Sequence, residues 1–134
     1  CRVDTIEKDE QMIRVARHFL EKYDSNHQVR LFEADALIPP EGLKMYDLIF
    51  IDAAKAQYQK FFERYLPFLK PEGVIICDNL HFHHLRPENV SRQTRQLLKK
   101  IERFKQFLSQ HESYETIFFE GGDGMSLTRS SGQK

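Results

Sequence analysis

The sequence predicts an α/β fold built on a doubly wound, mostly parallel sheet. Short apolar runs alternate with stretches of helical periodicity, which is typical of βαβ units. Two of these segments, at 46–52 and 74–78, each contain four consecutive apolar residues, as expected for strands that are covered on both faces. The last two strand patterns, at 114–119 and 125–128, flank the residues GGDG and predict a C-terminal antiparallel hairpin.

The first part of the chain predicts two short strands around one helix. Residues 2–7 and 29–34 read as strands, and residues 8–24 have helical periodicity. The apolar positions of this helix recur at three- and four-residue steps. We expect them to face the core: Met12, Ala16, Phe19, Leu20 and Tyr23.

The rest of the chain adds a crossover helix, a long helix and the hairpin. Residues 56–69 predict a helix that kinks or ends early at Pro67. Residues 70–73 form a turn before the strand at 74–78, and residues 89–110 predict the long helix. The expected order is β-α-β-β-α-β-α-β-β, with the hairpin at the edge of the sheet.

Composition excludes several classes of protein. With 134 residues the chain has the length of one domain, and its 20 basic and 20 acidic residues cancel. This balance disfavours a strongly basic nucleic-acid binder and an acidic disordered tail as descriptions of the whole chain. No apolar run is long enough for a signal peptide or a membrane span, and two cysteines make no disulfide framework. We therefore expect a cytoplasmic protein with no membrane partner.

Acidic side chains stand where two neighbouring strands end. Asp52 closes the strand at 46–52, and Asp78 closes the strand at 74–78, followed by Asn79. One crossover helix joins these strands, so we expect them to be neighbours whose carboxylates lie within roughly 5 Å. Two bare carboxylates at that distance repel by ~3 kcal/mol at an effective dielectric near 20. With the amide oxygen they are hard ligands for Mg²⁺, Ca²⁺ or Mn²⁺; the alternative is that each acid caps the segment after it.

Three further residues fall near the same predicted edge. Lys55 follows Asp52 by three residues, so it can serve as a general base beside a cation or remain a solvated lysine. Glu7, at the end of the first strand, can accept both ribose hydroxyls of a nucleotide or nucleoside cofactor. Asp35 follows the second strand, where an adenine would be held.

Three runs of the sequence resemble a known enzyme family: FIDAAKAQY at 50–58, LKPEGVIICDN at 69–79 and GGDGMSLTR at 121–129. They resemble the cation-dependent O-methyltransferases, the class I S-adenosylmethionine (SAM)-dependent family that includes catechol and caffeoyl-CoA O-methyltransferases. The spacing of the acidic helix, DNLHF, RPENV and the hairpin looks most like the bacterial branch that methylates 5-hydroxyuridine in tRNA. The resemblance covers nearly the whole chain; IDAAK and CDN are its specific parts, whereas many methyltransferases share the LKPEG turn. It implies a Rossmann-like fold and one methyltransferase domain over residues 1–134.

The resemblance implies a metal site and a base. Asp52, Asp78 and Asn79 would ligate Mg²⁺ or Mn²⁺, and Lys55 would deprotonate the acceptor hydroxyl, with Asp52 as its catalytic neighbour. A cation-bound hydroxyl is more acidic, because the metal stabilises the developing oxyanion. The implied acceptor is a tRNA nucleoside or a small phenol.

The resemblance also implies a SAM site. Glu7 would hold the ribose, Asp35 and Ala36 would border the adenine, and Asp52 and Tyr58 would contact the cofactor. The full-length protein would be a homodimer.

The chain departs from the family at its N-terminus, where the family's first strand, its glycine-rich turn and an N-terminal helical segment are absent. We therefore expect an N-terminally truncated, partial domain. The absent strand would lie between the strands at 2–7 and 46–52. Losing about six buried side chains forfeits roughly 9–18 kcal/mol, against a total stability of ~5–15 kcal/mol. We expect that this chain alone is not a stable, active monomer; direct pairing of those two strands would contradict this.

Two other functions remain open at this point. Glu7 also fits a nicotinamide-dependent dehydrogenase, although Lys55 and the Asp78-Asn79 pair would then have no role. A non-catalytic module that keeps part of a nucleotide site is the other alternative. The basic face of helix 89–110 fits either tRNA phosphates or plain solvent. Three histidines lack the partners of a zinc site and fit substrate contact better: His81, His83 and His84.

Overall fold

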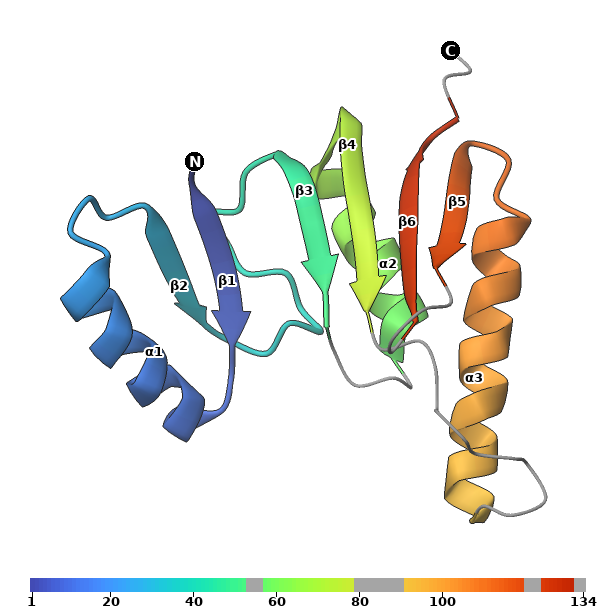
Figure 1. Ribbon diagram of the computed structural model, residues 1–134, viewed down its shortest axis with the longest axis horizontal. Helices are drawn as coiled ribbons and strands as arrows, with labels where there is room; N and C mark the ends of the chain where they lie inside the picture. The colour runs from blue at the N-terminus through green and yellow to red at the C-terminus, as the bar shows by residue number, and fades with distance from the viewer. Residues whose placement is uncertain (53–56, 79–90, 120–123, 132–134) are drawn as a thin grey trace. The chain divides into compact units, whose positions relative to one another are not determined.

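The computed structural model describes residues 1–52, 57–78, 91–119 and 124–131, without the side chains of residues 93, 94 and 97. The element order along the chain is the expected one (Figure 1). The chain divides into two compact units, residues 1–43 and 44–134, which are described separately below. None of the described helices is both long and apolar enough to cross a membrane.

The first unit is a two-stranded parallel sheet with one helix. Strands β1 (Val3–Glu7) and β2 (Val29–Glu33) pair in register from Val3 opposite Val29 to Glu7 opposite Glu33. Helix α1 (Glu10–Tyr23) begins where the side chain of Asp9 accepts hydrogen bonds from the amides of Gln11 and Met12. Such caps satisfy amides that have no partner inside the helix. Because β1 and β2 are parallel, both strands bring their carboxyl ends to the same edge of this sheet.

The expected core face of α1 is wrong at three positions. Met12, Phe19 and Tyr23 are more than half exposed, whereas Ala16 and Leu20 are half-buried. The one buried residue of the helix is Ile13. The physical reason is that a two-stranded sheet is too narrow to cover the whole apolar stripe of a four-turn helix.

The second unit is a four-stranded mixed sheet in the order β3-β4-β6-β5. Strand β4 pairs parallel with β3 and antiparallel with β6, and β6 pairs antiparallel with β5. The expected hairpin is therefore present, but β6 lies inside the sheet, so that β5 is the only edge strand of the hairpin. The elements are β3 (Tyr46–Ile51), α2 (Tyr58–Tyr65), the 3₁₀ helix η2 (Leu66–Phe68), β4 (Leu69–Asp78), α3 (Arg92–Ser109), β5 (Tyr114–Phe119) and β6 (Met125–Ser130).

Pro67 and Gly73 shape the segment that leads into β4. Helix α2 stops at Tyr65 and continues as η2, with Pro67 in its first turn, which confirms the expected early end. Strand β4 begins at Leu69, five residues earlier than expected, because the turn at 70–73 is taken up as an irregularity in the ladder with β3. A Cβ at Gly73 would lie 3.0 Å from the carbonyl oxygen of Asp47, so this close approach favours glycine.

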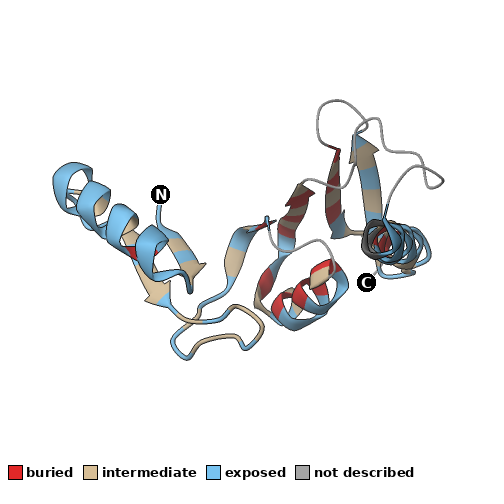
Figure 2. Ribbon diagram, turned by 90° about the horizontal axis from the view of Figure 1, so that it is seen from below, coloured by how far each residue is buried: buried red, intermediate tan, exposed pale blue. Residues whose placement is uncertain are grey.

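Within the described part of the second unit, the helices cover one face of the sheet. On the covered face, Ile75 and Cys77 are fully buried, and Figure 2 shows the buried residues on the strands and on the helix surfaces facing them. The aromatic residues of α2 and α3 meet there, with the Phe62 and Phe104 rings 6.0 Å apart. The opposite face carries apolar side chains about half exposed: Leu48, Phe50, Ile117 and Phe119.

This exposure corrects the expectation that the strand at 46–52 is buried on both faces. A continuous apolar run shows that both faces are apolar, but burial also needs an element to cover each of them. In this unit, α2 and α3 both pack on the side of Ile75 and Cys77. Strands β1 and β3 belong to different sheets.

Candidate functional site

The ladder between β3 and β4 brings Asp52 and Asp78 to the same edge of the sheet. Ile51 is the register partner of Cys77, so the next residue on each strand, Asp52 and Asp78, follows in step. Neighbouring strands lie about 4.8 Å apart. This confirms that the two strands are neighbours. Asp52 is exposed and Asp78 half-buried, so their carboxylates stand at the boundary between core and solvent.

Tyr58 is a buried residue bonded to the strand end that carries Asp78. Its side chain is 1% exposed, and its hydroxyl donates a hydrogen bond to the backbone carbonyl of Asp78. Burial raises the pKa of Tyr58 well above its ordinary value, and the negative charges of Asp52 and Asp78 raise it further. The hydroxyl therefore stays protonated and remains a donor at any pH the protein would work at. Sequence reasoning assigned Tyr58 a cofactor contact and missed this internal bond.

A second set of acidic residues ends the strands of the first unit. Glu7 Oε1 accepts hydrogen bonds from the backbone amides of Lys8 and Asp9, at 3.1 and 3.0 Å. Neither bond uses Oε2, so the carboxylate is oriented by its own chain and keeps an oxygen for a ligand. The Asp35 carboxylate is held similarly by the amide of Leu37, at 2.9 Å.

Lys8 links the two acids of this edge. Its Nζ lies 3.9 Å from Asp35 Oδ2, an exposed and therefore weak ion pair. Ala36 follows Asp35 in the same turn and is half-buried. The residues expected to hold a ribose and an adenine thus lie at one edge of the β1-β2 sheet.

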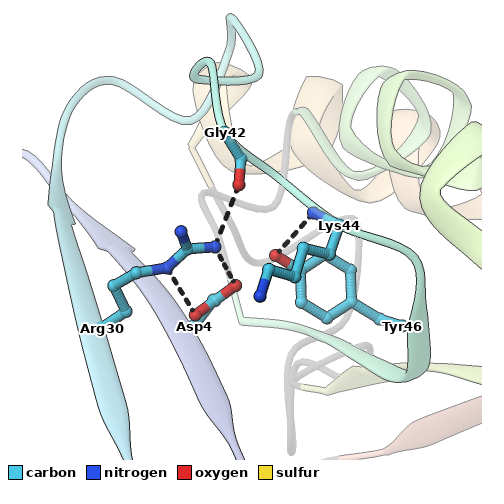
Figure 3. Close-up of polar contacts among 5 residues, drawn as sticks. All are labelled: Asp4, Arg30, Gly42, Lys44 and Tyr46. Carbon is cyan, nitrogen blue, oxygen red and sulfur yellow. Dashed lines mark hydrogen bonds and ion pairs between the residues drawn. The ribbon is translucent and has the colours of Figure 1, made fainter. Parts of the chain in front are cut away.

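The opposite end of the first unit is held by a separate polar cluster (Figure 3). The Arg30 guanidinium pairs with both carboxylate oxygens of Asp4, at 3.1 and 2.8 Å, and also donates to the carbonyl of Gly42 at 3.0 Å. Such bidentate pairing fixes geometry as well as charge. Because Asp4 and Arg30 are register partners on β1 and β2, this cluster ties the loop at Gly42 to the sheet. Its role is structural.

Several expected site residues lie outside the described part of the chain. These are Lys55, Asn79, the histidines at 81, 83 and 84, and most of the GGDG turn. Among the described residues no group of three or more His, Cys, Asp or Glu side chains converges as metal ligands would. Of the three expected metal ligands, the described part of the chain contains two, Asp52 and Asp78.

These carboxylates suit a hard cation by their chemistry. Carboxylate oxygens are preferred by Mg²⁺ and Mn²⁺, which usually bind through one or two carboxylates and keep water as further ligands. A buried donor, the Tyr58 hydroxyl, supports one of the two strand ends. The donor set present thus fits a divalent ion that is partly exposed to solvent.

Comparison with known proteins identifies the family. The family model described as O-methyltransferase matches residues 1–131. The chain belongs to the O-methyltransferase family. This membership favours the methyltransferase hypothesis over the nicotinamide-dependent dehydrogenase.

Individual relatives agree in fold and sequence. A putative caffeoyl-CoA O-methyltransferase from Staphylococcus aureus is 39% identical over 97% of this chain and 65% of its own, with a TM-score of 0.83. An O-methyltransferase from Bacillus cereus, solved in complex with SAH, is 28% identical over 97% of this chain and 63% of its own, with a TM-score of 0.74. The tapetum-specific methyltransferase 1 of Arabidopsis thaliana is 27% identical over 96% of this chain. The chain spans 58% of the length of that relative.

Proposed function

We propose that this protein transfers the methyl group of SAM to a hydroxyl oxygen, with the help of a divalent cation. The observation that carries the proposal is the pair Asp52 and Asp78, which the β3-β4 register brings to one edge in a chain of this family. Mg²⁺ or Mn²⁺ held there would lower the pKa of an acceptor hydroxyl. Asn79 is the proposed third ligand.

The residues of the chain would divide the remaining work. Lys55 would take the proton of the acceptor hydroxyl, a role that requires its amine to be neutral beforehand. Glu7 would accept hydrogen bonds from the cofactor ribose through Oε2, because Oε1 is already bonded to the backbone. Asp35 and Ala36 would border the adenine, and Tyr58 stays a proposed cofactor contact. The main contribution to rate would be the orientation of the two reactants.

Calorimetry of cation and cofactor binding tests this proposal. We expect the protein, with whatever residues flank this chain, to bind both SAH and Mn²⁺. Asp78→Ala should weaken Mn²⁺ binding by at least about a hundredfold, since it removes a ligand and not merely a residue behind one. SAH binding should change little.

Asp47→Ala is the matched control, because Asp47 is an exposed aspartate on the same strand as the site. It should bind Mn²⁺ like the unmodified protein. Equal Mn²⁺ affinity in Asp78→Ala and the unmodified protein would refute the metal site, and binding of NAD in place of SAH would favour a dehydrogenase.

For the acceptor we propose 5-hydroxyuridine in tRNA. Helix α3 supports this choice, because it contains six basic residues and one acidic residue in a chain of zero net charge. Arg95, Lys99 and Arg103 are exposed and four residues apart, so they lie on one helix face at steps of about 6 Å. They border a groove of about 380 Å³. A row of cations suits the phosphates of a nucleic-acid strand.

Charge reversal on α3 tests the tRNA acceptor. The triple substitution Arg95→Glu, Lys99→Glu and Arg103→Glu should lower methylation of tRNA by about tenfold or more at 100 mM salt, because it replaces attraction for phosphates by repulsion. Methylation of a free small phenol should stay within about twofold of normal, because a neutral acceptor has no phosphate to lose. Radiolabelled methyl transfer measures both.

Arg14→Glu together with Lys22→Glu on α1 is the control, since both positions are exposed. It should leave tRNA methylation nearly unchanged. An equal loss for tRNA and phenol in the α3 variant would argue against tRNA binding at this helix.

A small phenol is the second candidate acceptor, favoured by a relative from Niastella koreensis, a catechol O-methyltransferase that is 32% identical over 59% of this chain. Side-by-side assays with tRNA and catechol-like phenols separate the two. A homodimer and a cytoplasmic location remain predictions.

A further inference from the structure

We propose that Tyr58 is a positioning residue for the cation site: its hydroxyl holds the end of β4 so that Asp78 stands opposite Asp52. This inference rests on the proposed function, because it assigns a task to Tyr58 only if Asp52 and Asp78 hold a cation. It gives the residue a role inside the protein in addition to any contact with a cofactor.

The position of the hydrogen bond is the first argument. Asp78 is the last residue of β4, and the hydroxyl of Tyr58 binds its backbone carbonyl from the start of α2. The final residue of a strand has lost its neighbours on one side and tends to fray. A bond to its carbonyl restrains the peptide that carries the Asp78 side chain.

The rigidity of Tyr58 itself is the second argument. Its ring stacks on Phe104 of α3, with centroids 5.8 Å apart and planes 14° from parallel, and its side chain is 1% exposed. A side chain locked in this way loses little further entropy when it holds a neighbour. The hydroxyl is therefore held in one position, and its hydrogen bond holds the end of β4 in place.

The direction of the hydrogen bond is the third argument. A carbonyl oxygen can only accept, so the Tyr58 hydroxyl is the donor in its bond to Asp78. A donor behind a ligand-bearing residue orients the ligand before the cation arrives. Residues behind metal ligands commonly contribute about 10- to 100-fold in metal affinity.

Tyr58→Phe tests the proposal, because it removes the hydroxyl and keeps the stacked ring. In the protein with its natural flanking residues, we expect Mn²⁺ affinity by calorimetry to fall by about tenfold. The apparent KM for the cation should rise in proportion, by more than kcat at saturating cation falls. Tyr65→Phe is the matched control, since Tyr65 is a buried tyrosine at the other end of the same helix, and it should bind Mn²⁺ normally.

The outcomes separate the two proposals. If Asp78→Ala loses Mn²⁺ binding but Tyr58→Phe binds Mn²⁺ like the unmodified protein, the positioning role is wrong and the metal site stands. If the unmodified protein binds no Mn²⁺, both are wrong.

A second measurement needs no variant. In the unmodified protein with ¹³C-labelled tyrosine, Mg²⁺ should shift the ring resonances of Tyr58 with the midpoint found by calorimetry, and leave those of Tyr65 in place. Unchanged Tyr58 resonances at saturating Mg²⁺ would overturn the positioning role.

Discussion

Cys77 immediately precedes Asp78, and its thiol lies in the core of the second unit. The residue has no solvent exposure, whereas the other cysteine, Cys1, is exposed. Burial raises the pKa of the Cys77 thiol to about 12, and the facing Ser126 hydroxyl offsets only part of this. The thiolate is the reactive form of cysteine, so Cys77 is held in its unreactive form. A thiol next to a candidate metal ligand is thereby kept out of the chemistry.

This raised pKa predicts that stability falls in alkaline solution. The unfolded thiol loses its proton near its ordinary pKa of 9.0, but the folded thiol keeps it to about 12. Between these values the unfolded state binds fewer protons, so the free energy of unfolding decreases as pH rises. The single thiol contributes a slope of at most about 1.4 kcal/mol per pH unit in that window.

Urea unfolding from pH 8 to 11 measures this slope. Cys77→Ala should flatten it above pH 9, whatever the variant does to absolute stability. Cys1→Ala, at an exposed position, should leave the slope unchanged. An identical slope in Cys77→Ala would contradict the assignment.

At the scale of single elements, the entry into β4 depends on one close contact. Gly73 approaches both Leu69 and the backbone of Asp47, at the place where the β3-β4 ladder changes register. The LKPEG residues lie within this irregularity, which determines which side chains of the following strand face each side of the sheet. A shift by one residue would turn the Asp78 side chain to the other face.

We expect Gly73→Ala to destabilise the second unit by about 1–3 kcal/mol, because an added Cβ would stand 3.0 Å from the backbone oxygen of Asp47 and 2.6 Å from Leu69 Cδ1. The neighbouring Glu72→Ala is the control, since Glu72 is exposed and its truncation should cost less than about 0.5 kcal/mol. Thermal unfolding of both variants decides the comparison. Equal melting temperatures would show that the ladder relaxes around the methyl group.

At the scale of the whole molecule, the exposed apolar face of the second sheet stands out. Leu48, Phe50, Ile117 and Phe119 are each about half exposed, and each belongs to the face opposite α2 and α3. Folded monomers rarely expose large contiguous apolar patches, because these associate. One face of the sheet is buried under the helices, whereas this face is open to solvent, so it can drive association of the isolated chain.

We expect the isolated chain 1–134 to bind a hydrophobic dye and to associate as its concentration rises, because this face is apolar and exposed. The double substitution Phe50→Ser and Ile117→Ser should reduce both effects. Dye fluorescence and analytical ultracentrifugation are the measurements. Cooperative melting of a dye-free monomer would contradict both this prediction and the expectation that the chain alone is not stable.

Local patterns determined most of the elements and the chemistry at their ends. The turn at Pro67, the strands at 46–51 and 114–119 and the hairpin follow from backbone chemistry and periodicity. The neighbouring strand ends at Asp52 and Asp78 follow from the crossover rule, which needs no knowledge of the rest of the fold. The resemblance over residues 50–58 and 69–79 then indicated the family that comparison identifies.

Tertiary structure alone decided which apolar surfaces are covered and what holds the site. Leu48 and Phe50 are exposed because the covering of a strand depends on elements distant in sequence. The composition of the strand itself does not show whether such elements are present. The bond from Tyr58 to the Asp78 carbonyl joins residues twenty positions apart through a backbone atom, which no side-chain pattern reveals. Periodicity reports what a segment can bury, whereas packing determines what it does bury and which hydroxyl meets which carbonyl.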